Sequence, residues 1–125
     1  MSRARSVLLL LAGALLGAGG VSAMTDKHWL QLDGSDWQRF GNAEREAWAQ
    51  GFLAGHAVGR LPDSVARDTL AAAATLERQR KEGGLALPFA SSVYTARLGD
   101  YYRWENHQAH PLWRGLLDVN GELRR

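Results

Sequence analysis

The sequence predicts an all-α fold, a small bundle of about four helices that follows a cleaved signal peptide. Apolar residues recur at the three- and four-residue spacing of an amphipathic helix in separate stretches. No stretch shows the sustained alternation of apolar and polar residues that a half-buried strand requires. Glycine, proline or a capping residue stands between the helical stretches, so we expect short connections.

The first 23 residues have the three-part layout of a secretory signal peptide. Arg3 and Arg5 supply the positive start, an apolar run covers 7–16, and the small residues 21–23 precede Met24. The alternative is a membrane anchor, but the run is shorter than the roughly 20 residues that a spanning helix needs. We therefore expect cleavage after residue 23, export to the periplasm or the medium, and no stable membrane insertion afterwards.

Residues 24–125 are expected to form a single helical domain. Without Arg3 and Arg5, thirteen basic residues remain against thirteen acidic ones. A neutral domain lacks the concentrated positive charge of nucleic-acid-binding proteins, so we expect no nucleic-acid partner. The chain has no cysteine, which excludes disulfides and a thiol nucleophile.

The polar residues 24–34 show no clear period and are expected to be a lead segment, either disordered or with Trp29 and Leu30 tucked onto the core. Ser35 should then open a short helical turn, in which Gln38 completes an S-x-x-Q capping box.

Two long helices follow. The first is expected from Ala43 to about Gly59, with Asn42 as its N-cap. The second is expected from Asp63 or Ser64, which follow the helix-breaking Pro62, to about residue 82, because Gly83 and Gly84 end it.

Two shorter helices complete the predicted bundle. The third begins at Ser91 or Ser92 and ends near Trp104, with Tyr94, Leu98 and Tyr101 on one face. The last has Pro111 at its first position and ends at 120–121. Its expected buried stripe consists of Leu112, Trp113, Leu116 and Leu117.

Small residues recur every four positions along the first long helix, at Ala47, Gly51, Gly55 and Gly59. Each glycine inside a helix costs about 1 kcal/mol relative to alanine, so something should offset the cost. One interpretation is close packing of the alanine-rich second helix against this face. The other is a surface groove that receives a partner's helix or loop.

Three residues near the last connection suggest a metal site: Glu105, His107 and His110. Imidazoles three positions apart can share one helical face, but no second cluster completes a four-ligand site. We therefore expect no metal and no other cofactor, and keep these residues only as weak candidates. His56 is interpreted as an edge residue whose ring covers an apolar neighbour rather than as a catalytic base.

No catalytic motif is recognisable. The sequence contains no G-x-S-x-G, S-x-x-K or H-E-x-x-H and no glycine-rich phosphate loop. We therefore expect a protein without catalytic residues, although a hydrolase with an unrecognised site stays a third hypothesis.

Trp104 ends the third predicted helix, just before the polar residues Glu105, Asn106 and His107. Either it is half-buried and closes the end of the bundle, or it is an exposed anchor for a protein partner, with Asn106 and His107 beside it.

Residues 48–55, which read aromatic-x-x-Gly-Phe-x-x-Gly, and the later 98–102 with Asn106 and Pro111 resemble short exported bacterial helical proteins of unassigned function. This resemblance covers about half of the chain after residue 23. Residues 51–55 followed by Leu61 and Pro62 are also similar to the periplasmic immunity proteins of type VI secretion amidase effectors. Both resemblances imply a small helical protein without catalytic residues.

The leading hypothesis is therefore a non-enzymatic exported protein that binds an unidentified protein partner, as an inhibitor or immunity factor. The alternative is a periplasmic protein that binds a small ligand or a metal.

Overall fold

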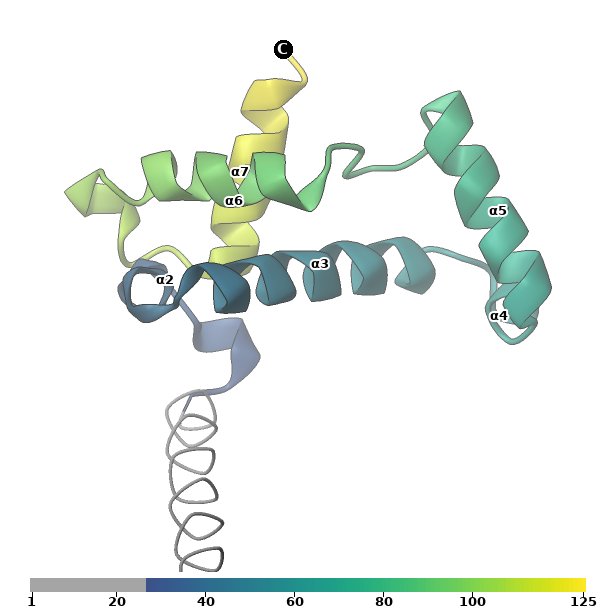
Figure 1. The fold of residues 1–125 in the computed structure, drawn as a ribbon, viewed down its shortest axis with the longest axis horizontal. Helices are drawn as coiled ribbons and strands as arrows, with labels where there is room; N and C mark the ends of the chain where they lie inside the picture. The colour runs from purple at the N-terminus through teal and green to yellow at the C-terminus, as the bar shows by residue number, and fades with distance from the viewer. Residues whose placement is uncertain (1–26) are drawn as a thin grey trace, which may run out of the picture. The chain divides into compact units, whose positions relative to one another are not determined.

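The computed structural model describes residues 27–125 (Figure 1). The predicted signal peptide over 1–23 and the first residues of the lead segment lie outside the described residues. The chain divides into two compact units between Leu32 and Asp33, a boundary inside the single domain that the sequence predicts. Within the described residues, none of the helices combines the length and apolar character needed to cross a membrane.

The described part of the first unit contains one short 3-10 helix, Trp29–Gln31. His28 caps it, because its Nδ1 accepts a hydrogen bond from the backbone N–H of Leu30 at 3.2 Å. Trp29 is 59% exposed, and Leu30 is also exposed.

The second unit is entirely helical, and over residues 27–125 no strand occurs, which confirms the all-α class. Its elements, in chain order, are α2 (Gly34–Arg39), α3 (Asn42–Gly59), α4 (Asp63–Ala66), α5 (Thr69–Glu82), α6 (Ser91–Tyr101), the 3-10 helix η2 (Glu105–His107) and α7 (Leu112–Leu123).

Aspartates set two helix starts that the sequence predicts at other residues. Asp33, rather than Ser35, caps α2, and it forms a capping box with Asp36 instead of the predicted Gln38. Asp68 divides the predicted second long helix into α4 and α5, because its carboxylate accepts from the first two N–H groups after Thr69. In each case a carboxylate satisfies backbone donors that a helix start leaves unpaired.

The end of α7 also differs from the prediction. Asn120 does not stop the helix, which continues to Leu123. Its side chain is buried and accepts from the hydroxyl of Tyr94 at 2.8 Å, so it serves packing between α6 and α7 instead of capping. Within the predicted stripe of α7, Leu112 and Leu116 are fully buried, whereas Leu117 is exposed.

The core lies where α6 packs against α3 on one side and α7 on the other, with α2 at one end (Figure 1). Ala49 is completely buried on α3, the helix that α6 approaches. Ser91 and Thr95 of α6 donate hydroxyl bonds to Glu46 of α3, which fixes the alignment of these two helices. The largest fully buried side chains are those of Trp37, Tyr94, Leu98, Tyr102, Leu112, Leu116 and Val119.

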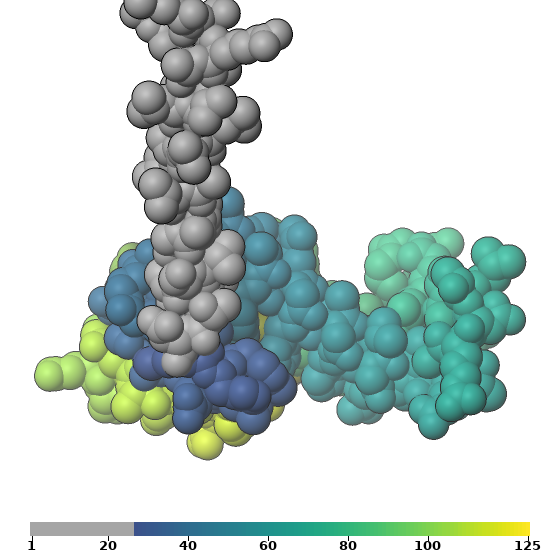
Figure 2. Space-filling model, turned by 90° about the horizontal axis from the view of Figure 1, so that it is seen from below, coloured from purple at the N-terminus to yellow at the C-terminus, as the bar shows by residue number. Residues whose placement is uncertain are grey.

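Helix α5 takes little part in this core. None of its residues is buried, and Leu70 is 83% exposed. Figure 2 shows the residues of α4 and α5, in teal to green, gathered at one side of the second unit, away from α2. The helix therefore depends on its local sequence: the Asp68 cap, four successive alanines and a left-handed Gly83 at its end.

The small-residue face of α3 is not covered by α5, contrary to the predicted packing. A Cβ atom added at Gly51, Gly55 or Gly59 would meet nothing within 4 Å, and Ala47 on the same face is exposed. In the part of the chain that the structure describes, the cost of these glycines is thus not offset by close helix packing.

Candidate functional site

The connection between α6 and α7 carries the most exposed aromatic side chain of the second unit. We call residues 103–110 the tip segment. Trp104 lies at its start in an extended conformation, and its side chain is 67% exposed, so it does not close the end of the core as a half-buried residue. Asn106 and Glu105, in the following 3-10 turn, are exposed beside it in sequence.

Backbone hydrogen bonds organise the tip segment into consecutive tight turns. The N–H of His107 donates to the carbonyl of Trp104 at 3.0 Å, and that of His110 donates to the carbonyl of His107 at 2.9 Å. The N–H of Gly34, at the start of α2, donates to the carbonyl of Gln108 at 3.0 Å. These bonds give the segment a defined path outside the short 3-10 helix η2 as well.

Tyr102 fastens the tip segment to the core. Its ring is almost fully buried, and its hydroxyl donates to the carbonyls of His110 at 2.9 Å and Pro111 at 3.1 Å. Glycines make room for this ring, because a Cβ at Gly34 would overlap Tyr102 and one at Gly115 would lie 2.7 Å from its hydroxyl. The residue therefore joins the packed interior to both ends of the connection.

Tyr101 forms a second set of hydrogen bonds, and the chemistry of the groups shows which one donates in each. Its hydroxyl lies 2.8 Å from Oδ2 of Asp118 and 2.6 Å from Nδ1 of His110. An ionised carboxylate only accepts, so the hydroxyl donates to Asp118 and His110 donates its Nδ1–H to the tyrosine oxygen. Arg114 donates to the other carboxylate oxygen of Asp118 at 3.2 Å, which completes the network.

His107 covers the ring of Tyr101. The two rings are stacked at 4.1 Å between centroids, with 14° between their planes. Nδ1 of His107 lies 2.9 Å from the carbonyl oxygen of Tyr101, so this nitrogen also carries a proton and donates. His107 is thereby fixed by the end of α6 and is half-buried, unlike Trp104 and Asn106.

Burial is the main cause that raises the pKa of Tyr101 well above its usual range, and the hydrogen bond and charge of Asp118 add to it. Burial likewise raises the pKa of Tyr102, with the nearby Tyr101, Asp33 and Asp118 adding to it. Both hydroxyls therefore stay protonated at neutral pH and act as donors that hold the tip segment.

The three weak metal candidates do not form a ligand set. Among residues 27–125, no group of three His, Cys, Asp or Glu side chains is placed to hold a metal ion. The rings of His107 and His110 are 5.4 Å apart, but their Nδ1 atoms are bonded to Tyr101, and Glu105 is exposed on η2. These two histidines instead hold the connection in place.

Other residues singled out in the sequence have structural surroundings. His56 stacks on Phe52 of α3 with 6.2 Å between centroids, which agrees with the interpretation as an edge residue. Trp48 lies between Trp37 and Phe52 in the same row of rings. The small-residue face at 47, 51, 55 and 59 stands open, and it lies on α3 rather than on the tip segment.

Comparison with known proteins does not name a family. No protein-family model, curated protein or solved structure matches the chain. The residue geometry of the second unit is thus the basis for any statement on function.

Proposed function

We propose that the chain is an exported protein, with residues 1–23 as its signal peptide, that binds another protein without catalysing a reaction. Trp104 is the centre of the binding surface, with Asn106 and His107 next to it. An inhibitor or immunity factor works in this way, because it needs a rigid surface rather than a reactive group. The bundle of α2, α3, α6 and α7 serves as the scaffold.

The observation that carries the proposal is an exposed indole on a fixed segment. Tryptophan is enriched among the residues that dominate binding energy, and two-thirds of this side chain is exposed. An interface that buried the exposed part would remove on the order of 150 Å² from water. At about 25 cal/mol per Å², this burial contributes about 4 kcal/mol.

The hydrogen bonds of the tip segment lower the cost of binding. Ordering a flexible loop at an interface costs free energy, and a segment already held in one conformation avoids most of that cost. Tyr101, Tyr102, His107 and His110 hold the connection before any partner arrives. A preorganised surface of this kind favours tight binding over a small area.

Affinity capture with a matched control tests the proposal. The tagged protein, recovered from the exported fraction of producing cells, is compared with Trp104→Ala and Trp29→Ala. Trp29 is also an exposed indole, so nonspecific capture would fall equally in both variants. We expect one partner that Trp29→Ala retains and Trp104→Ala loses, with affinity for the purified partner lowered by about 30-fold or more. Equal capture by both variants would contradict the proposal.

A further inference from the structure

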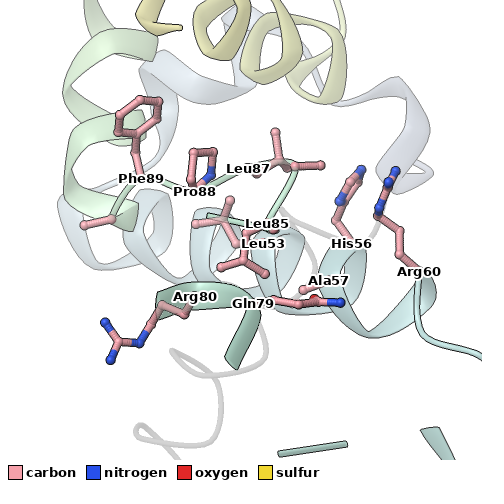
Figure 3. A pocket seen from close by; sticks show the side chains of 13 residues that line it. Leu53, His56, Ala57, Arg60, Gln79, Arg80, Leu85, Leu87, Pro88 and Phe89 are labelled. Carbon is pink, nitrogen blue, oxygen red and sulfur yellow. The ribbon is translucent and has the colours of Figure 1, made fainter. Parts of the chain in front are cut away.

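A cavity of ≈ 530 Å³ lies at the C-terminal end of α3. Its walls are the last turn of α3, the end of α5 and the connector 84–90 between α5 and α6 (Figure 3). The volume falls in the range of about 300–1,000 Å³ that is typical of small-molecule sites. None of the residues of the tip segment lines it, so it is separate from the surface around Trp104.

The middle of the cavity is apolar. Leu53 contributes from α3, and the connector contributes several apolar side chains (Figure 3). These are Leu85, Leu87, Pro88 and Phe89. Polar groups make up about as much of the lining as apolar ones, so the cavity suits a ligand that has both an apolar and a polar part.

One end of the cavity is cationic. His56 and Arg60 project side by side from α3 there, whereas Arg80 lies at the opposite side (Figure 3). Glu77 already binds the guanidinium of Arg80 at two nitrogens, 2.6 and 2.9 Å away. No described residue forms a hydrogen bond or ion pair with the guanidinium of Arg60, and the lining contains no Asp or Glu. The charge that lacks compensation is therefore that of Arg60.

Hydrogen bonds hold the connector wall at two of its backbone groups, the carbonyl of Ala86 and the N–H of Phe89. The carbonyl of Ala86 accepts from Nδ2 of Asn120 and Nη1 of Arg124, both at 3.1 Å. The N–H of Phe89 donates to the hydroxyl of Tyr94 at 3.4 Å. These two groups are therefore already paired, and a ligand that makes few hydrogen bonds along its length does not compete for them.

We propose that this cavity binds a small amphipathic carboxylate. The carboxylate lies at Arg60, beside His56, and the alkyl chain lies over Leu53 and the connector. Arginine matches a carboxylate with two parallel N–H donors, and the apolar side chains of the lining remove part of the alkyl chain from water.

The proposal is tested by calorimetric titration with decanoate, kept below its critical micelle concentration. The protein is used as it is recovered from the producing cells. Acetate carries the same head without the chain, and decyltrimethylammonium carries the same chain with the opposite charge. We expect saturable binding of decanoate at one site, and no saturable binding of acetate or the cation at the same concentrations. Equal binding of the cation, or no saturation by decanoate, would overturn the proposal.

Arg60→Ala and Arg67→Ala locate the site. Both arginines are exposed, but Arg67 lies between α4 and α5 and does not line the cavity. We expect Arg60→Ala to weaken decanoate binding about tenfold and Arg67→Ala to leave it unchanged. In amide NMR spectra, decanoate should shift signals of residues 84–90 and not those of the tip segment. An unchanged affinity in Arg60→Ala, or shifts outside the cavity lining, would refute the assignment.

Discussion

Replacing glycines on the open face of α3 with alanine should stabilise the protein. Gly51 and Gly55 lie inside the helix, and a Cβ atom at either position meets nothing within 4 Å. Alanine is about 1 kcal/mol better than glycine inside a helix, so the double variant should gain about 2 kcal/mol. For a domain of this size, that gain corresponds to a rise in Tm of about 8 °C or more. Thermal and urea denaturation followed by circular dichroism measure it.

Gly115→Ala in α7 is the matched control. The substitution is again glycine to alanine, and its gain in helix propensity is the same as on α3. Here, however, the added methyl group would lie 2.7 Å from the hydroxyl of Tyr102 and 3.2 Å from Cδ2 of Leu98. Overpacking of about 2 kcal/mol outweighs the propensity gain of about 1 kcal/mol, so we expect a net loss of about 1 kcal/mol.

The opposite result on α3 would refute the reasoning. If the Gly51→Ala and Gly55→Ala variant were destabilised, a methyl group there would have to meet another part of the protein. The close packing of the alanine-rich helix that the sequence suggested would then be correct. Repeating the melts at two protein concentrations would separate this outcome from an interface between copies of the chain.

Three further outcomes are expected. Asp68→Ala removes the N-cap of α5, so amide hydrogen exchange should accelerate in α5 by an amount equivalent to about 1 kcal/mol and stay unchanged in α6. Equal acceleration in both helices would contradict the separation of α5 from the core. Burial raises the pKa of Tyr94, Tyr101 and Tyr102, so the stability that their hydroxyls confer should be complete below about pH 10 and decline above it. Phenolate absorbance measures their ionisation, and finding all three ionised in the native state near pH 10 would contradict this prediction. Tyr101→Phe should cost about 1 kcal/mol in urea denaturation, because Asp118 loses one of its two donors and keeps Arg114. An unchanged midpoint would argue against the network.

The sequence predicted the helical class and the bounds of α3 closely, because those signals are local. Periodicity and the break at 41–42 lie within a few residues of the element that they define. The end of α7 could not be predicted in this way. Asn120 followed by glycine is a typical helix stop, but its side chain is committed to Tyr94, 26 residues away. Likewise, spacing alone placed the glycines on one face without showing what that face meets.

The sequence indicated which residues belong to the candidate site but not which hydrogen bonds hold them. Trp104, Asn106 and His107 stood out as an aromatic followed by polar residues, and exposure distinguishes Trp104 from a residue that closes the core. The bonds from Tyr101 to His110 and Asp118 were missed, because Tyr101 reads as an ordinary apolar position on the face of its helix. The sequence signal for this anchor is the pair of adjacent tyrosines directly before the loop. Neighbouring positions on a helix point in different directions, so two hydroxyls there can bond to different parts of the loop.

The two surfaces of the second unit should respond differently to loss of stability. The tip segment is held by Tyr101 and Tyr102, whose rings are part of the core, so its conformation persists as long as the core does. The cavity depends in part on α5, which buries none of its residues and is stabilised mainly by its caps and short-range pairs. Local melting of α5 would therefore open the cavity while Trp104 stays presented, because the free energy of that opening is smaller than that of global unfolding. The proposed ligand binding at the cavity and the proposed partner binding at the tip segment should then respond separately to substitutions in α5 and in α6.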